Sequence, residues 1–233
     1  MPKQQTIEKP ISLKGVGIHT GTEVTLTFKP SKENTGYVFC RVDLPEKPIV
    51  EASINYVVNT ERGTNLDKNG IKIKTSEHVL AALVGMEIDN ILIELNAPEP
   101  PIMDGSSKFF IEALEKAGIK KQKIDRDEYI VKEVISYYDE DSGSDITVIP
   151  SKNYEVTAMV DFGTKILGTQ NATMKNISQF KTDFANARTF SFLHEIEMLL
   201  DNGLIKGGDL NNAIVYVDKE LSDSTMDKLK KAF

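Results

Sequence analysis

The chain has 233 residues, of which 40% are hydrophobic and 27% charged, so it has the composition of an ordinary globular protein with room for one large or two small domains. This composition excludes an intrinsically disordered chain and a collagen-like repeat. The 28 Lys and Arg residues against 35 Asp and Glu residues give a net charge of −7, which argues against nucleic acid as a partner because phosphate binding requires clustered cations.

The cysteine count and the N-terminus indicate the compartment. Cys40 is the only cysteine, so the chain can form neither an internal disulfide nor a zinc–thiolate site, and we expect a cytoplasmic protein. Residues 1–6 are polar and lack the apolar core of a signal peptide. The longest apolar run, 79–84, is too short to span a bilayer, so we expect no transmembrane segment.

Strand and helix patterns alternate in the first half. Period-two alternation over 24–28 predicts a strand, and Asn69-Gly70 between two short β-rich runs predicts a hairpin turn. Helices are expected over 75–85 and 106–118, because Ser or Thr residues that would cap them stand at each start and Gly stands at each end. The apolar run 88–95 between them predicts a buried strand.

The second half repeats this alternation. The polar stretch 120–128 is interpreted as a linker, and 146–149 is expected to be a strand. Apolar residues at helical spacing predict helices over 177–184 and 193–200, and 213–217 is expected to be a strand. A last helical pattern occurs over 221–233, without a terminating cap.

A short pattern occurs twice and indicates an internal duplication. Ile11-Ser12 precedes a strand that ends at a Pro-Ser turn, and Ile135-Ser136 precedes a second strand with the same ending. We therefore expect an α+β fold of two similar sheet-plus-helix domains. The expected division is a first domain over 1–119, the linker over 120–128, and a second, incomplete domain over 129–233.

Glu77-His78 is the most informative pair of candidate catalytic residues. Near a helix start, one of two neighbours can ligate a metal while the other reaches the water beside it, which is an arrangement of hydrolases. The alternative is a solvated helix N-terminus with Glu77 near the positive end of the helix dipole. The residues alone leave both interpretations open.

The glycine-punctuated segment 15–21, which contains His19, has a phosphate-cradle interpretation and a simpler one as a tight bend. A strand follows it instead of a helix, so the dinucleotide-binding fingerprint is not met. The sequence also contains no Walker loop, no Gly-x-Ser-x-Gly elbow and no His-Glu-x-x-His motif. These absences remove the support for kinase, esterase-elbow and zincin functions.

Two features of the second half have alternative interpretations. The hydroxyl of Thr189 can donate to a developing oxyanion or can cap the following helix. An apolar series around three glycines can line a groove for an acyl chain or pack a small core. This series includes Ile196, Leu204, Ile205, Leu210, Ala213 and Val215. The loop 98–106 is interpreted as structural.

Six motifs occur in register along nearly the whole chain. They are Gly17-Ile18-His19-Thr20-Gly21, Thr75-Ser76-Glu77-His78, Ile88-Asp89-Asn90, Pro101-Ile102-Met103-Asp104-Gly105-Ser106, Ala187-Arg188-Thr189-Phe190 and Gly207-Gly208. In this order they resemble the zinc-dependent UDP-3-O-acyl-N-acetylglucosamine deacetylases of lipid A biosynthesis. The resemblance implies two α+β domains, each with a small insert.

The resemblance also implies roles for individual residues. His78 would be a zinc ligand, Glu77 the general base for hydrolysis of the acetamide, and Thr189 a donor to the oxyanion. Contacts to the acylated UDP-sugar substrate are implied at Phe162, Phe192, Ile196, Ile205, Gly208, Leu210, Ala213 and Val215. Most of these residues belong to a hydrophobic passage for the acyl chain, and Phe162 would lie near the sugar.

The chain departs from the family pattern in two places. The His-Lys-x-x-Asp helix and the further histidine that complete the family's site after the strand corresponding to 213–215 have no counterpart here. Catalytic zinc needs about three protein ligands, so we expect this chain to be the N-terminal part of a longer enzyme and inactive alone. Gly163-Thr164-Lys165 also replaces the usual His-Pro.

The resemblance leaves two further points open. Some family members carry a 3-hydroxyacyl carrier-protein dehydratase at the C-terminus, and this chain resembles those members, but the sequence leaves open whether a dehydratase follows here. The alternative to a deacetylase is a catalytically silent fragment or acyl-binding module.

Overall fold

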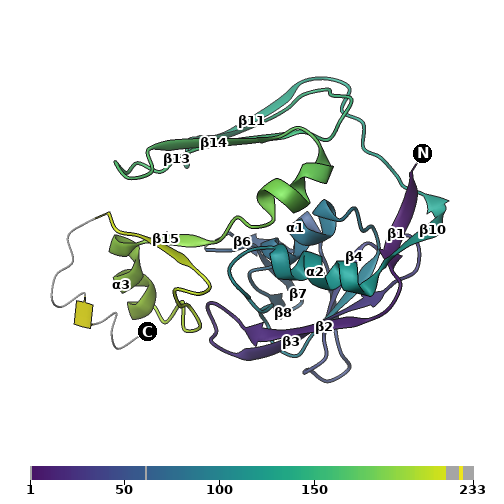
Figure 1. The fold of residues 1–233 in the computed structure, drawn as a ribbon, viewed down its shortest axis with the longest axis horizontal. Coiled ribbons are helices and arrows are strands. Elements are labelled where there is room, and N and C mark those ends of the chain that lie inside the picture. The colour runs from purple at the N-terminus through teal and green to yellow at the C-terminus, as the bar shows by residue number, and fades with distance from the viewer. Residues whose placement is uncertain (1, 61, 219–225, 228–233) are drawn as a thin grey trace.

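A computed structural model describes residues 2–60, 62–218 and 226–227. The described chain is α+β and has three layers (Figure 1). A five-stranded sheet lies on one side, helices α1 (Glu77–Gly85) and α2 (Lys108–Ala117) lie in the middle, and two β-hairpins lie on the other side. The fold class is the one that the sequence predicts.

The five-stranded sheet contains most of the buried core. Its order is β2-β3-β9-β4-β5, with β4 and β9 parallel and the other neighbours antiparallel. Alternate residues of its strands point toward the helices, and Phe28, Phe39 and Ile93 are completely buried there. The strands are β2 (Ile11–Val16), β3 (Glu23–Pro30), β4 (Tyr37–Arg41), β5 (Ile49–Glu51) and β9 (Ile91–Leu95).

Both predicted helices of the first half form, but their serines do not cap them. Ser76 and Ser107 stand at the N-cap positions without a capping hydrogen bond from the side chain. The Ser76 hydroxyl donates to the Thr64 carbonyl oxygen at 2.9 Å, and the Ser107 hydroxyl donates to the His78 carbonyl oxygen at 3.0 Å. Both hydroxyls therefore join the helix starts to other segments, which local sequence does not reveal.

The predicted β excursion is a three-stranded sheet. It contains β6 (Val57–Asn59), β7 (Asn65–Lys68) and β8 (Ile71–Ile73), and the short 3-10 helix η1 (Ile54–Tyr56) precedes it. Asn69 and Gly70 form the turn between β7 and β8, with φ angles of 55° and 85°. These positive values are those of the hairpin turn that Asn-Gly favours.

The stretch predicted as a linker is mostly a strand. Residues Ile119–Asp125 form β10, which pairs antiparallel with β1 (Lys3–Ile7). The interpretation of 120–125 as a linker is wrong in this respect, because the hydrogen-bonding partner of this polar stretch lies at the other end of the first half. The division of the chain into two domains stays a prediction.

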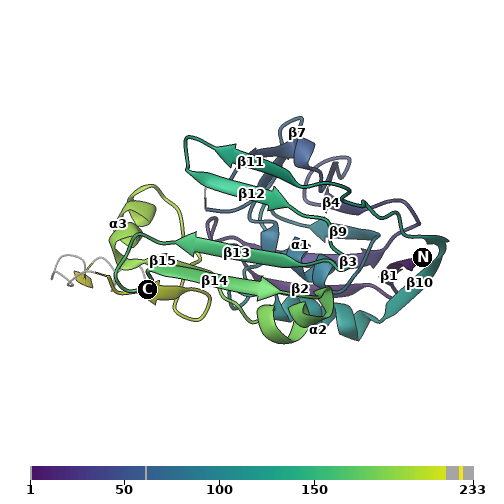
Figure 2. The ribbon, with the colours of Figure 1, turned by 90° about the horizontal axis from the view of Figure 1, so that it is seen from above.

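The second half begins with two hairpins. They are β11 (Ile135–Asp139) with β12 (Ser144–Val148), and β13 (Val156–Asp161) with β14 (Thr169–Met174), and Figure 2 shows them side by side. Most of their side chains are exposed. Ser136 pairs with Thr147 through their hydroxyls at 3.0 Å, as Ser12 does with Thr27 at 2.8 Å. The likeness of these hairpins agrees with a duplication, which stays a prediction.

Residues 190–216 lie at the end of the molecule away from the N-terminus (Figures 1 and 2). The predicted helix at 177–184 is a 3-10 turn, η2 (Ile177–Gln179), followed by a single π-helical turn, η3 (Phe180–Phe184). Strands β15 (Phe190–Phe192) and β16 (Ile214–Tyr216) pair in parallel, and α3 (Leu193–Asp201) follows β15 directly. Most of the predicted helix at 221–233 lies outside the described residues.

Candidate active site

A cavity of about 650 Å³ lies where the two halves meet. The first half contributes the β2–β3 turn, the segment before α1, the first turn of α1 and the loop before α2. The second half contributes the segment before β15, β15 itself, α3, and the segment 205–217, which includes β16. The lining residues are Ile18, His19, Arg62, Thr75, Glu77, His78, Ile102, Thr189, Phe190, Ser191, Leu193, Ile196, Leu199, Ile205, Gly208, Asp209, Leu210, Ala213, Val215 and Val217.

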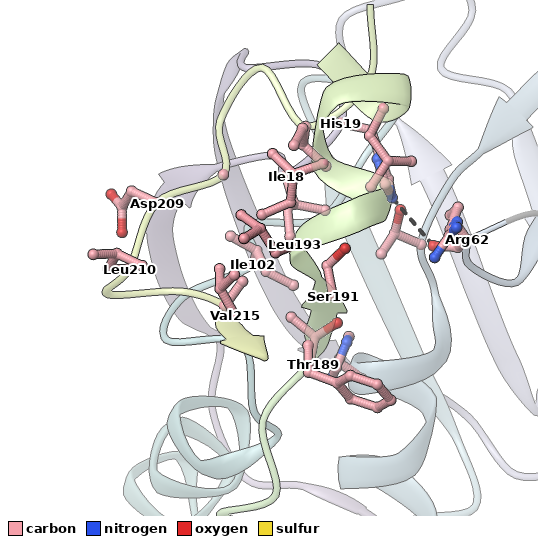
Figure 3. Close-up of a pocket in the computed structure, with 18 of the residues that line it drawn as sticks. Ile18, His19, Arg62, Ile102, Thr189, Ser191, Leu193, Asp209, Leu210 and Val215 are labelled. Atoms are coloured by element: carbon pink, nitrogen blue, oxygen red, sulfur yellow. Dashed lines mark hydrogen bonds between the residues drawn. The ribbon is translucent and has the colours of Figure 1, made fainter. Parts of the chain in front are cut away.

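The three residues predicted to carry chemistry line this one cavity. Glu77 and His78 are half-buried at the start of α1, and Thr189 reaches the cavity from the segment before β15. More than 100 residues separate Thr189 from the pair, so only the tertiary structure brings them together. Figure 3 shows Thr189 at one end of the cavity and His19 with Arg62 at the other.

The electrostatics of His78 favour its neutral form. Burial lowers the pKa of its imidazole below the ordinary value of 6.5, and the charges of Glu77 and Asp104 oppose this effect without reversing it. A neutral imidazole has a free ring nitrogen, which is the form that binds metal ions. His78 therefore has the protonation state that a metal ligand requires at neutral pH.

The carboxylate of Glu77 is held by the backbone of the first half. One of its oxygens accepts a hydrogen bond from the Thr64 amide at 2.8 Å. The Thr64 carbonyl oxygen also accepts from Ser76, so the loop before β7 contacts both the start of α1 and the side chain that lines the cavity. These contacts fix the direction in which the Glu77 carboxylate points.

Thr189 is not a helix cap. Its amide donates to the Gly105 carbonyl oxygen at 2.7 Å, and its own carbonyl oxygen accepts from the Ile214 amide at 3.0 Å. Helix α3 begins four residues later, at Leu193, and its first turn is closed by the Glu195 carboxylate. The backbone of Thr189 is therefore anchored on both sides, and its side chain faces the cavity.

Most of the predicted acyl-contact residues also line the cavity. Ile196, Ile205, Gly208, Leu210, Ala213 and Val215 do so. Leu210 and Asp209 lie at the outer side of the cavity in Figure 3, and Leu210 is 72% exposed. The lining is mostly apolar, so an extended hydrocarbon fits it chemically.

Phe162 and Phe192 do not line the cavity. They pack edge to face around Phe190, with ring centroids 5.4 Å and 5.8 Å from it, and Phe190 itself reaches the cavity. The structure therefore places the two predicted substrate residues behind a third aromatic residue. Their contact with a substrate stays a prediction.

The sequence by itself assigns no role to several of the residues that line the cavity. Arg62 and Ser191 stand in no recognisable pattern, and His19 belongs to one of the six motifs without an assigned role. The His19 Nε2 atom lies 3.1 Å from the Arg62 carbonyl oxygen, as the dashed line in Figure 3 marks. The Arg62 guanidinium forms a two-point ion pair with Glu195 of α3. Such pairing between distant segments leaves no signal in the local sequence.

The metal-ligand set is incomplete within the part of the chain that the structure describes. No group of three His, Cys, Asp or Glu side chains lies close enough there to hold a metal ion. His78 is the candidate ligand that the sequence predicts, and one ligand does not make a zinc site. The described residues alone therefore do not fit a bound zinc ion.

The fold and the cavity together define an α+β chain whose site joins a carboxylate, an imidazole and a hydroxyl to a long apolar wall. Over residues 4–230 the chain matches the family described as LpxC, UDP-3-O-acyl N-acetylglycosamine deacetylase. The chain belongs to this family.

Named relatives support this membership. A bifunctional enzyme LpxC/FabZ of Bacteroides thetaiotaomicron is 44% identical over 98% of this chain and 50% of its own length. A protein of the same name from Chlorobaculum tepidum is 43% identical over 97% of this chain and 49% of its own length. A UDP-3-O-acyl-N-acetylglucosamine deacetylase of Myxococcus xanthus is 38% identical over 91% of this chain and 67% of its own length.

The chain spans about half the length of the first two relatives. Within the residues that the structure describes, no helix has both the length and the apolar character needed to cross a bilayer.

Proposed function

We propose that the protein to which this chain belongs removes the acetyl group from UDP-3-O-acyl-N-acetylglucosamine. The observation that carries the proposal is the meeting of Glu77, His78 and Thr189 in one apolar-walled cavity. Membership of the deacetylase family agrees with it. The acyl chain would lie along Ile196, Ile205 and Val215, where burial of each methylene contributes about 0.8 kcal/mol before ordering costs.

The chain's own residues would act as follows. Glu77, held by the Thr64 amide, takes a proton from the attacking water, and Thr189 donates a hydrogen bond to the oxygen of the tetrahedral intermediate. His78 would be one ligand of a zinc ion, and residues outside the described ones would complete the ligand set. When bound, zinc supplies Lewis-acid polarisation of the scissile carbonyl group.

The test is acetate release by the full-length protein, with Glu77→Gln as the decisive variant. Glutamine keeps an oxygen that accepts from the Thr64 amide but cannot act as a base, so we expect a rate loss of about 10²–10⁴-fold with an unchanged melting temperature. Glu23→Gln, at an exposed position of β3, is the matched control and should keep full activity. Activity that survives Glu77→Gln or removal of zinc by a chelator contradicts the proposal.

A second candidate is a silent acyl-binding module, favoured by the finding that no three His, Cys, Asp or Glu side chains among the described residues are grouped to hold a metal ion. Zinc analysis separates the two functions: the full-length protein should hold about one zinc ion if it is a deacetylase, and none if it is only a binding module. The bifunctional names of the longer relatives support the further proposal that a dehydratase shares the full-length chain. A cytoplasmic location is proposed from the lone, buried Cys40.

A further inference from the structure

A buried carboxylate lies beside the cavity without lining it. Glu99, in the loop that follows β9, is 1% exposed. Its oxygens accept from the Thr20 amide at 2.9 Å, the Thr20 hydroxyl at 2.8 Å and the Thr75 hydroxyl at 2.8 Å. The His19 amide is shared between both oxygens at 3.1 and 3.2 Å. Every one of these partners is a donor, which suits an ionised carboxylate.

Gly17 leaves the space that the Glu99 carboxylate occupies. A Cβ atom built on Gly17 would lie less than 3.0 Å from both the Glu99 carboxylate and the Thr20 hydroxyl oxygen. Only glycine fits there, because no larger side chain can occupy the space that the carboxylate fills. The glycine-punctuated β2–β3 turn is therefore built around Glu99.

The other partner, Thr75, has an unusual backbone. Its φ angle is +49°, in the left-handed region that β-branched residues rarely adopt. Such a conformation persists only where surrounding contacts hold it. The Thr75 side chain is held by Glu99, and its amide lies 3.3 Å from the Asn65 side-chain oxygen.

Thr75 stands two residues before α1, next to the N-cap residue Ser76. Its backbone angles set the direction of the chain over the next three residues, and the last two of these are Glu77 and His78. A relaxed Thr75 would rotate the first turn of α1 and carry both side chains away from Thr189. A displacement of about 1 Å at a reacting group is enough to lower a rate by about 100-fold.

We propose that Glu99 is a positioning residue of this site: through the Thr75 hydroxyl it holds the Glu77–His78 pair in place. The effect on catalysis rests on the proposed deacetylase function. The geometry that Glu99 imposes on α1 does not depend on that function, so it is tested separately.

The experiment compares Thr75→Val with Thr20→Val in the full-length protein. Each variant removes one hydroxyl from the same carboxylate, but only Thr75 leads into α1, and Thr20 does not line the cavity. We expect Thr75→Val to lower kcat by about tenfold or more with KM changed by less than about twofold, and Thr75→Ser to restore kcat. Thr20→Val should keep kcat and lose only stability.

A second readout does not depend on activity. The Thr64 amide donates to Glu77, so it should exchange its hydrogen faster in Thr75→Val and at the normal rate in Thr20→Val and Thr75→Ser. Equal exchange and equal kcat in the two valine variants would overturn the inference, as would failure of Thr75→Ser to restore either quantity. If the unmodified protein releases no acetate, the proposed function fails, and the exchange rates alone decide the role of Glu99.

Discussion

The guanidinium of Arg62 and the carboxylate of Glu195 form a two-point ion pair, with N–O distances of 3.1 and 2.7 Å, between residues 133 positions apart. Arg62 comes from the loop before β7, and Glu195 lies in the first turn of α3. The pair therefore joins the first half of the chain to the wall of the cavity that the second half supplies. Its charges are only partly shielded from water.

This pair predicts a pH-dependent stability. Hydrogen bonding by Arg62 holds the pKa of Glu195 below its ordinary value of 4.5, against the opposing effect of burial. A carboxyl group whose pKa is lowered by folding stabilises the protein above its ordinary pKa, and this contribution is lost as the pH falls through the folded pKa. Arg62→Gln should therefore cost about 1 kcal/mol or less at pH 7 and nothing measurable once Glu195 is protonated.

Thermal unfolding between pH 7 and pH 3 checks this expectation. The difference in melting temperature between the unmodified chain and Arg62→Gln should shrink below about pH 4.5. The control is Glu195→Gln, in which a further Arg62→Gln change should have no effect at any pH. A constant difference over the whole range would show that the ion pair is not its source.

The close approach of Gly105 to the Asn212 backbone predicts a large loss of stability when a single methyl group is added at Gly105. Gly105 has φ of +86°, and a Cβ atom there would lie well inside 3.0 Å of the Asn212 carbonyl oxygen. Gly105→Ala should cost about 3 kcal/mol or more, because the crowding adds to the backbone strain. Gly70→Ala is the matched control, since Gly70 has φ of +85° with open space around it, and should cost about 1 kcal/mol.

Urea unfolding of both variants gives the two free energies. The loss in Gly105→Ala should exceed the loss in Gly70→Ala, because only the first also has to push the Asn212 backbone away. Equal losses would mean that the loop before α2 moves freely relative to the segment around Asn212.

The buried amide of Asn90 predicts a specific cost for an isosteric change. Its nitrogen donates to Gln4 and Gln122, both at 2.8 Å, and its oxygen accepts from the Thr35 and Gly36 amides. Asn90→Asp keeps the acceptor and turns the donor into a second acceptor, so the Gln4 and Gln122 side-chain oxygens each lose this donor and face a carboxylate oxygen instead. We expect a loss of about 1–3 kcal/mol at pH 7.

The control for this change is Asn96→Asp. The Asn96 side chain is exposed, and its oxygen accepts from the Thr25 amide, so aspartate keeps this hydrogen bond. Chemical unfolding should show a change within about 0.5 kcal/mol for Asn96→Asp. A similar result for Asn90→Asp would indicate that the Gln side chains rearrange at no cost.

The apolar wall predicts a change in acyl-chain selectivity. Ala213 is half-buried in the cavity lining, so Ala213→Leu reduces the space available to a hydrocarbon. In the full-length protein we expect KM for long-chain substrates to rise about tenfold while KM for short-chain substrates stays the same. Ala172→Leu, at an exposed position of β14, is the control. An equal rise for both chain lengths would place the acyl chain elsewhere.

Local patterns predict much of the fold. The helices α1, α2 and α3 and the Asn69-Gly70 turn follow from apolar spacing and turn residues, both of which act within a few positions along the chain. The failures share another cause. Strand β10 resembles a linker because most of its residues are polar. The sequence does not reveal it as a strand, because its partner β1 lies about 115 positions away. Ser76 and Ser107 resemble caps in the sequence. They do not act as caps, because their hydroxyls donate to carbonyl oxygens of other segments.

The candidate site divides in the same way. Glu77 and His78 are neighbours along the chain, so the sequence alone indicates their chemistry, and the order of the six motifs indicates the family. The role of Glu99 has no such signal, because a carboxylate in a Pro-rich loop is expected to be solvated until folding surrounds it with four donor groups. The sequence by itself determined which segments form helices and strands and which side chains can do chemistry. Only the tertiary structure decided which of them meet, because burial, ion pairing across the cavity and hydrogen bonds between distant segments exist only once the chain has folded.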